Sequence, residues 1–328
     1  MGLYIQFSHE WTRCQCLRSF LSVSDFGRPE IEGVLARAES FRTSIREGDI
    51  PPLLKGKVIG LLFEKPSTRT RTSFEVAALR LGGRPLYLAA NELQLSRGEP
   101  VKDTARVLGR YLDILVARVN SHDTLDELSR YSGLPVVNAL SNLEHPTQLV
   151  SDLLTLKQVK GTLQELNFTY IGDGNNVCNS LLLGAATVGM NIKVACPEGY
   201  EPNHAILERA KSLSRINGSK VEVVHDPIKG AAEADALYTD VWVSMGQEAE
   251  TKRRMKSFQG YQINSALLKV AKKDVTVMHC LPAHRGLEIT DEVLEGEHSV
   301  VWQQAENKLY GAAAVLEWIA GRGDGSER

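Results

Sequence analysis

The sequence predicts an α/β protein built from two doubly wound parallel-sheet domains, with a C-terminal helix that packs back on the first domain. Its length of 328 residues allows two domains of about 150 residues each. Short apolar runs alternate with longer amphipathic stretches over most of the chain. Such alternation is typical of parallel strands that are covered by helices on both faces of the sheet.

Short apolar segments bounded by polar turns are the expected strands. They cover residues 58–63, 114–119, 135–139, 168–171, 192–195, 221–224, 236–238 and 275–279. Helices are expected at residues 72–81, 101–111, 124–131 and 149–159, from about residue 180, and at about 311–319. We expect an N-terminal extension over residues 1–16, a first domain over 17–150, a second domain over 151–305, and a C-terminal helix and tail over 306–328.

The bulk composition excludes several classes of protein. A formal charge of −2 and a pI of about 6.5 give no support for a nucleic-acid partner. No apolar run approaches the roughly 20 residues that a membrane span needs, and residues 1–16 lack the apolar core of a secretory signal. The five cysteines are odd in number and widely spread, so we expect no disulfide framework, no metal site and a cytoplasmic location.

The most informative stretch joins the expected strand 58–63 to the expected helix 72–81. Three hydroxyls and a guanidinium stand there, on Ser67, Thr68, Arg69 and Thr70. A helix N-terminus has free backbone N–H groups and a partial positive charge, so this combination favours a phosphate site. A Thr-capped surface helix with a solvated arginine is the alternative interpretation.

Two further segments carry polar side chains next to expected strands. His145 and Gln148 flank the start of a helix at Pro146 and can face one direction, which suits a planar carbonyl–amine group. Arg118 lies near the carboxyl end of the expected strand 114–119. Taken singly, the first pair could be a structural histidine at a helix cap and Arg118 a surface charge.

The second half of the chain contributes three loops. Gly172-Asp173-Gly174 lacks the third glycine of a dinucleotide fingerprint, so it is weak evidence for NAD. The loop from Asp240 to Gly246, with Ser244 and Met245, could hold an ammonium group and close over it. Cys280 follows the expected strand 275–279 beside a cationic cleft, where its pKa could be lowered, although a buried strand cysteine is the commoner case.

Taken together, these segments resemble the transcarbamoylases. Ser67-Thr68-Arg69-Thr70-Arg71, followed by Ser73-Phe74-Glu75, is similar to the carbamoyl phosphate loop of that family. The tetrapeptides at residues 145–148 (His-Pro-Thr-Gln) and 279–282 (His-Cys-Leu-Pro) resemble two further signatures of the family. Ser244-Met245-Gly246 and Cys280 resemble the branch that acts on ornithine, and the match runs from about residue 17 to residue 318.

The resemblance implies transfer of a carbamoyl group from carbamoyl phosphate to the δ-amine of L-ornithine, without a metal or organic cofactor. The implied catalytic residues are Arg69, Arg118, His145 and Cys280. The implied carbamoyl phosphate contacts are Ser67, Thr68, Arg69, Thr70, Gln94, Arg118, His145, Gln148, Cys280, Leu281 and Lys308. The implied ornithine contacts are Asn176, Asp240, Ser244 and Met245.

Two positions bear on assembly and on a departure from the family. By resemblance, Gln94 would reach a neighbouring subunit, which implies a homotrimer or a multiple of trimers. The segment Ala305-Glu306-Asn307-Lys308 resembles the family's closing segment, in which arginine normally follows asparagine. Lys308 keeps the charge but lacks the two-pronged donor geometry, which puts its contact with carbamoyl phosphate in doubt.

Three alternatives remain open at this point. The acceptor could be another amine, such as N-acetylornithine or putrescine. The chain could be a non-catalytic relative that binds the ligands as a regulator, which Lys308 favours and the complete set Arg118, His145, Gln148 and Cys280 argues against. An NAD-dependent oxidoreductase rests only on residues 172–174.

Overall fold

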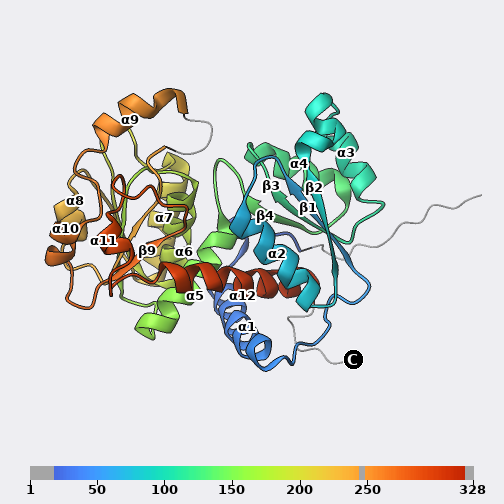
Figure 1. Cartoon of the computed structure of the whole chain (residues 1–328), viewed down its shortest axis with the longest axis horizontal. Helices are drawn as coiled ribbons and strands as arrows, with labels where there is room; N and C mark the ends of the chain where they lie inside the picture. Colours follow the sequence, from blue (N-terminus) through green and yellow to red (C-terminus); the bar gives the residue numbers. More distant parts are fainter. Residues whose placement is uncertain (1–17, 244–247, 322–328) are drawn as a thin grey trace, which may run out of the picture.

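The chain folds into two α/β lobes that lie side by side and are joined underneath by long helices (Figure 1). This computed structural model describes residues 18–243 and 248–321. The predicted extension over residues 1–16, most of the predicted tail, and the predicted site residues Ser244 and Met245 lie outside the described residues.

The first lobe contains a four-stranded parallel sheet in the order β2-β1-β3-β4. Its strands are β1 (Val58–Phe63), β2 (Arg84–Ala89), β3 (Ile114–Arg118) and β4 (Val136–Leu140). Its helices are α2 (Thr68–Arg80), α3 (Val101–Leu108) and α4 (His122–Ser132). Strands β2 and β3 lie on opposite sides of β1, so the direction in which strands are added to the sheet reverses there. A crevice is therefore expected between the carboxyl ends of β1 and β3.

The second lobe contains a five-stranded parallel sheet in the order β7-β6-β5-β8-β9. Its strands are β5 (Asn167–Ile171), β6 (Asn191–Ala195), β7 (Val221–Val224), β8 (Ala236–Thr239) and β9 (Thr276–His279). Its helices are α6 (Asn176–Val188), α7 (His204–Asn217), α8 (Pro227–Ala231), α9 (Thr251–Ser257), α10 (Ser265–Val270) and α11 (Asp291–Leu294). The corresponding crevice lies between β5 and β8.

Three long helices connect the lobes: α1 (Arg28–Glu47), α5 (Pro146–Lys160) and α12 (Val301–Ile319). Helix α12 packs against α1, α2 and α5, which confirms the predicted fold class and the return of the C-terminal helix to the first lobe. In the described ranges, no helix is long and apolar enough to cross a membrane.

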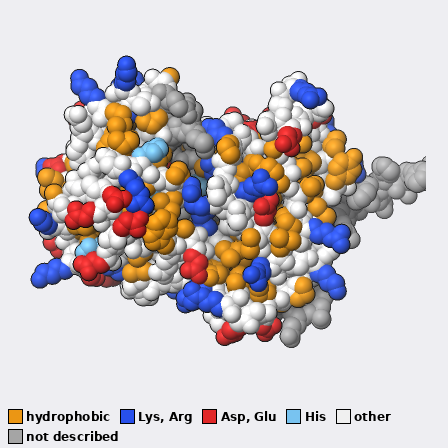
Figure 2. Space-filling view, in the orientation of Figure 1, with side chains coloured by type: hydrophobic (Ala, Val, Ile, Leu, Met, Phe, Trp, Pro, Cys, Tyr) orange, Lys and Arg blue, Asp and Glu red, His pale blue; other side chains and the backbone are white. Residues whose placement is uncertain are grey.

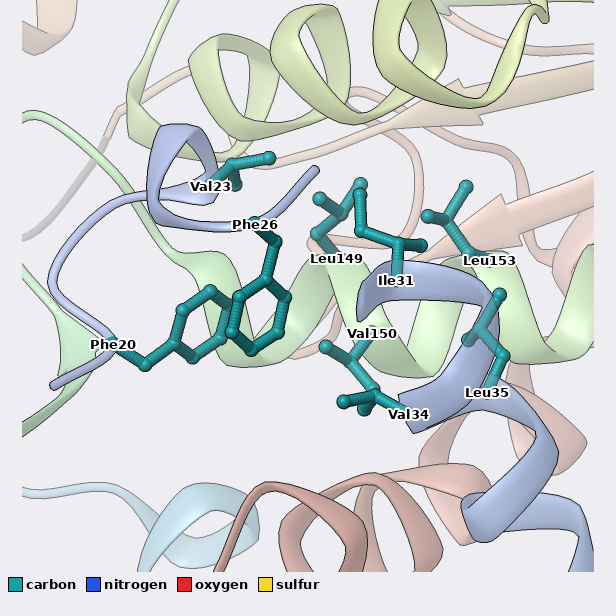
Figure 3. A pocket seen from close by; sticks show the side chains of 9 residues that line it. All are labelled: Phe20, Val23, Phe26, Ile31, Val34, Leu35, Leu149, Val150 and Leu153. Atoms are coloured by element: carbon teal, nitrogen blue, oxygen red, sulfur yellow. The ribbon is translucent and has the colours of Figure 1, made fainter. Parts of the chain in front are cut away.

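The core runs continuously beneath both sheets because α5 and α12 are buried along most of their length. Near the N-terminal end of the described chain, Phe20 and Phe26 stack with their ring centroids 4.1 Å apart. These rings border a small apolar gap against α1 and α5 (Figure 3). No polar side chain lines this gap, so it is a packing feature of the core rather than a ligand site.

Some element boundaries differ from the prediction. Strand β2 was not predicted because it is an edge strand with exposed Arg84 and Leu86 and with Pro85 in its run. Helix α2 begins at Thr68, four residues earlier than expected, because Ser67 caps it by accepting the Thr70 N–H. Helices α6 and α12 begin at Asn176 and Val301, also earlier than expected, so Lys308 lies within a helix.

Candidate active site

A cleft of about 980 Å³ lies between the two lobes, at the carboxyl ends of the strands. Residues that follow β1, β3, β4, β5, β8 and β9 all line it. In the space-filling view, Lys and Arg side chains lie at the junction of the two lobes (Figure 2). Every predicted site residue within the described ranges lines this cleft except Gln94.

The first turn of α2 presents the predicted phosphate site to the cleft. Thr68 is exposed, Ser67 and Arg69 are half-buried, and Thr70 is buried, and all four line the cleft. The free N–H groups of this helix end therefore face the same space as the hydroxyls. Arg71 does not line the cleft. It pairs with Glu75, and its guanidinium lies 3.5 Å from the centroid of the Tyr87 ring.

Arg118 brings a buried guanidinium to the cleft from the end of β3. Its side chain is only 8% exposed, and its Nε has no hydrogen-bond partner among the residues that the structure describes. Burial lowers the pKa of Arg118 to about 10, while Cys280 and Asp240 act in the opposite direction. The group stays cationic at neutral pH and lines the cleft, where its charge can stabilise a negatively charged ligand group.

His145 is the N-cap residue of α5 and is held by its neighbours. Its backbone N–H donates to the Ser180 hydroxyl (2.8 Å), and the Thr147 hydroxyl lies 3.5 Å from its Nδ1 atom. Burial, with the positive charges of Lys308 and Arg118, lowers the pKa of His145 well below its usual value. The imidazole is therefore neutral and can donate one hydrogen bond into the cleft without accepting a proton first.

Gln148 lies one turn further along α5 and is bonded at both ends of its amide. Lys308 Nζ donates to Gln148 Oε1 (2.6 Å), and Gln148 Nε2 donates to Asp152 Oδ1 (2.8 Å). Gln148 and Lys308 are nearly buried but still line the cleft. The two predicted residues thus meet each other across α5 and α12.

On the opposite wall, Asp240 is the centre of a short hydrogen-bonded group. Its carboxylate accepts from Cys280 Sγ (3.0 Å) and from Asn175 Nδ2 (2.8 Å). Burial and the Asp240 charge raise the pKa of the Cys280 thiol well above its usual value. Of the two interpretations of Cys280, the raised pKa supports a buried cysteine and not a thiol activated by the cleft, because burial and the neighbouring Asp240 anion both oppose its ionisation. Cys280 is a protonated hydrogen-bond donor.

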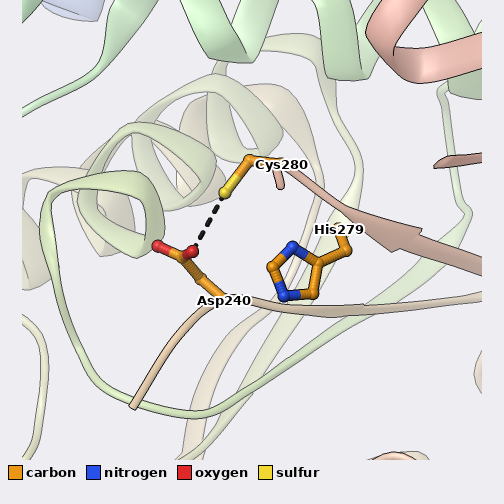
Figure 4. Close-up of side chains that lie close together, drawn as sticks. All are labelled: Asp240, His279 and Cys280. Atoms are coloured by element: carbon orange, nitrogen blue, oxygen red, sulfur yellow. Dashed lines mark hydrogen bonds between the residues drawn. The ribbon is translucent and has the colours of Figure 1, made fainter. Parts of the chain in front are cut away.

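Asp240, His279 and Cys280 lie close enough for their ligand atoms to fall within 4.8 Å of one another (Figure 4). Both nitrogens of the His279 ring are already engaged, since Nδ1 accepts the Leu281 N–H (2.8 Å) and Nε2 lies 3.1 Å from Glu288 Oε1. The thiol is bonded to Asp240. Each of the three side chains thus already has a hydrogen-bond partner, and their chemistry does not call for a cation.

His279 also shapes the turn that presents Leu281. The Leu281 backbone has a left-handed φ of 58°, which is unusual for a residue with a branched side chain. The hydrogen bond from its N–H to the His279 ring holds this conformation. The predicted contact residue Leu281 is thus fixed by a histidine that the sequence analysis did not single out.

A buried ion pair stabilises the cleft wall near β5. Arg254 bonds to Asp173 (2.9 Å), to Glu250 (3.0 Å) and to the Trp242 carbonyl (3.1 Å). Burial raises the pKa of Asp173 to about 6 despite the attraction of Arg254. Gly174 follows Asp173 because a Cβ there would lie 2.3 Å from the Pro202 backbone nitrogen. Close chain approach accounts for this glycine without a nucleotide.

Two predicted site residues, Asn176 and Gln94, do not present a free side chain to the cleft of this chain as expected. Asn176 lines the cleft, but its side-chain amide donates to the Ser141 carbonyl (2.6 Å), and Asn175 is the residue bonded to Asp240. Gln94 is exposed on a short 3₁₀ helix (Gln94–Arg97) and lies outside the cleft of its own chain.

Comparison with protein families accounts for this arrangement. The family description "Aspartate/ornithine carbamoyltransferase, carbamoyl-P binding domain" matches residues 18–158, and "Aspartate/ornithine carbamoyltransferase, Asp/Orn binding domain" matches residues 164–319. The chain belongs to the aspartate/ornithine carbamoyltransferase family. The two matched segments correspond to the two lobes that face each other across the cleft.

Within this family, the chain is similar to several ornithine carbamoyltransferases. One from Archaeoglobus fulgidus is 50% identical over 306 residues, which are 93% of this chain and 98% of the relative. The anabolic ornithine carbamoyltransferase of Pyrococcus furiosus is 47% identical over 304 residues, which are 93% of this chain and 96% of the relative. A solved structure of the Pyrococcus furiosus enzyme gives a TM-score of 0.90 at 46% identity, covering 93% of this chain and 97% of that one.

Sequence reasoning missed several polar residues around this carbamoyltransferase cleft. Asn175 lines the cleft beside Asp240. Behind the lining residues lie Asp152, Gln304 and the His279–Glu288 pair. Asn175 follows a strand and precedes a helix, so its capping role could have been predicted. Asp152 and Gln304 occur in buried helices, and only their tertiary neighbours reveal them.

Proposed function

We propose that this protein transfers the carbamoyl group of carbamoyl phosphate to the δ-amine of L-ornithine, giving L-citrulline and phosphate. The observation that supports this most is one cleft with two chemically different walls. An anion-binding helix end and Arg118 lie on one wall, and Asp240 with Cys280 lies on the other. The similarity to anabolic ornithine carbamoyltransferases favours the citrulline-forming direction and a role in arginine biosynthesis.

Carbamoyl phosphate would bind against the first lobe. Its phosphate would accept hydrogen bonds from the first turn of α2, including Ser67, Thr68, Arg69 and Thr70. The carbonyl oxygen would lie near Arg118, His145 and Thr70, which stabilise the negative charge of the tetrahedral intermediate. Removing one such donor typically costs about 3 kcal/mol of transition-state stabilisation.

The carbamoyl nitrogen would donate hydrogen bonds to Gln148 Oε1 and to the backbone carbonyl of Leu281. This requires the amide oxygen of Gln148 to face the ligand, and the bond from Lys308 to that oxygen supports the orientation. Lys308 contributes its charge to this end of the site. Gln94 would complete a neighbouring subunit's site, in a homotrimer or a multiple of trimers.

Ornithine would bind against the second lobe. Asn176, Asp240, Ser244 and Met245 would hold its α-amino and carboxylate groups. Cys280 and Asp240 would orient the δ-amine toward the carbamoyl carbon. Because the thiol keeps its proton, Cys280 acts as a donor that fixes Asp240, and the Asp240 carboxylate is the acceptor on this wall.

The reaction then needs only alignment and charge stabilisation. The neutral δ-amine attacks the carbamoyl carbon, a C–N bond forms, and the carbon–oxygen bond to phosphate breaks. Phosphate leaves with the electron pair of the broken bond and takes up the proton that the attacking amine loses. Aligning two bound substrates can contribute roughly 7–11 kcal/mol to lowering the activation barrier.

The proposed reaction needs no cofactor. The two buried free thiols of Cys178 and Cys196 accord with a cytoplasmic location.

The deciding experiment supplies carbamoyl phosphate with ornithine, N-acetylornithine or putrescine as parallel acceptors and measures the carbamoylated product. We expect clear preference for ornithine. Preference for another amine would retain the phosphate site but overturn the proposed ornithine contacts. No turnover with any acceptor, in folded protein that binds carbamoyl phosphate, would instead support the regulatory alternative.

A further inference from the structure

The Gln148 amide is held from both sides by charged residues on two different helices. Lys308 of α12 donates to its oxygen at 2.6 Å, and Asp152 of α5 accepts from its nitrogen at 2.8 Å. Gln148 is 2% exposed and Asp152 is fully buried, so water competes little for these bonds. Hydrogen bonds to charged partners are about twice as strong as neutral ones.

The chemistry of the two partners permits a single orientation of this amide. An ammonium group only donates, and an ionised carboxylate only accepts. Lys308 therefore selects the oxygen end of Gln148 and Asp152 selects the nitrogen end. The second lone pair of the oxygen then stays available to an N–H donor in the cleft.

Asp152 extends this arrangement to the other lobe. Its carboxylate also accepts from Gln304 Nε2 (2.7 Å) and from the Tyr238 hydroxyl of β8 (3.1 Å). Gln304 Oε1 in turn accepts the backbone N–H of His279 (3.0 Å), the residue before Cys280. Asp152 is thus a common acceptor between the carbamoyl side of the cleft and the strand that carries the thiol.

We propose that Lys308 and Asp152 are positioning residues which orient Gln148 toward the carbamoyl nitrogen, and that Lys308 acts through Gln148 rather than as a phosphate ligand. This inference rests on the proposed function, since it concerns how carbamoyl phosphate is recognised. It also offers a reason why lysine can serve at position 308: one donor to Gln148 Oε1 is sufficient, and a two-pronged guanidinium is not needed.

The charge states required by this arrangement exist near neutral pH. Burial lowers the pKa of Lys308 to about 8 and raises the pKa of Asp152 to about 6. Lys308 faces Asp152 of α5, Cys280 after β9, Arg118 of β3, Arg69 of α2 and His145 before α5. Between these pKa values the ammonium donates and the carboxylate accepts, as the geometry requires.

The test compares two constants for Lys308→Met at pH 7.5: the KM for carbamoyl phosphate and the inhibition constant of inorganic phosphate. By the proposed function, inorganic phosphate would bind at the first turn of α2, the α2 subsite, but has no carbamoyl group. We expect the KM to rise roughly 10- to 100-fold, as for loss of a charged hydrogen bond, and the phosphate constant to change less than about 2-fold. Equal rises in both constants would make Lys308 a phosphate ligand and overturn the proposal.

Control variants make the comparison specific. Arg69→Ala, in the phosphate subsite, should raise both constants together. Lys269→Met removes an exposed lysine of α10 far from the cleft lining and should change neither. In a Gln148→Ala background, adding Lys308→Met should not raise the KM for carbamoyl phosphate further, because the amide through which Lys308 acts is absent. An additive effect there would contradict the inference.

A second variant covers the case in which Lys308→Met does not fold. Lys308→Arg keeps a charged donor and should keep the KM for carbamoyl phosphate within a few-fold of the wild type. It should also move the alkaline loss of kcat/KM for carbamoyl phosphate from near pH 8 to higher pH, because arginine stays protonated. An unmoved alkaline limb would contradict the role of Lys308. Citrulline formation by the wild type tests the proposed function separately.

Discussion

The two walls of the cleft carry charges of opposite sign, and they differ in how fully those charged groups are hydrogen-bonded within the protein. The first wall presents the cations Arg69, Arg118 and Lys308, and the buried Nε of Arg118 has no hydrogen-bond partner in the described ranges. The second wall presents Asp173 and Asp240, and both carboxylates are already bonded to neighbouring side chains.

This difference indicates that the first wall is the one where a charged ligand group would bind. Burial lowers the pKa of Arg118 and of Lys308 because it disfavours their charged forms. An anionic ligand beside them would stabilise those charged forms again. On the second wall, burial raises the pKa of Asp173, and the carboxylates hold thiol, amide and guanidinium groups in place. The first wall should therefore contribute more to the chemical step, and the second wall more to acceptor selection and to stability.

The largest effect is expected from Arg118→Met on the first wall. It removes the buried donor for the developing oxyanion, so kcat should fall by roughly 10²- to 10³-fold. Steady-state citrulline formation at saturating substrates measures this. The free energy of unfolding should stay equal or increase, because an apolar side chain replaces a desolvated charge. A kcat within 10-fold of the wild type would place the oxyanion elsewhere.

On the second wall, Asp240→Asn should act on the acceptor. Losing the carboxylate weakens a charged interaction with the amine, so the KM for ornithine should rise roughly 10- to 100-fold. The inhibition constant of inorganic phosphate should stay unchanged, because the α2 subsite is intact. If phosphate binding weakened by the same factor, the two walls would not be separable as described.

A smaller effect is expected from Cys280→Ser. Because burial and Asp240 keep the thiol protonated, a hydroxyl can replace it as donor to Asp240, and activity should fall less than about 10-fold. Cys280→Ala removes the donor and should cost more than serine does. Serine and alanine variants with equal activity would show that this hydrogen bond is not used.

The smallest effect concerns stability and pH. Asp173 has a pKa of about 6 in the folded protein and about 3.8 when unfolded, so the folded state binds more protons between these values. Wild-type stability should therefore fall as pH rises from 4 to 6, relative to Asp173→Asn. Denaturant unfolding of both proteins across this range isolates the difference. A constant difference would mean that Arg254 holds the Asp173 pKa near its ordinary value.

Much of the site could be predicted from the sequence because its residues follow apolar strands. Arg118 is the last residue of β3, Asp240 and Cys280 come directly after β8 and β9, and parallel strands bring their carboxyl ends to one edge. Boundaries were less predictable. Ser67 starts α2 earlier than the apolar pattern suggests, and the edge strand β2 has no buried face to produce a pattern.

The sequence by itself determined the fold class, the family and a core set of the residues that line the cleft, since these follow from local patterns and short motifs. Only the tertiary structure decided how those residues are supported. Lys308 is 160 positions from Gln148, and Asp240 is 40 positions from Cys280. Hydrogen bonds and pKa shifts depend on distances of a few ångströms and on burial, which arise only when distant segments pack together. That is why the raised pKa of the Cys280 thiol could not be read from its strand.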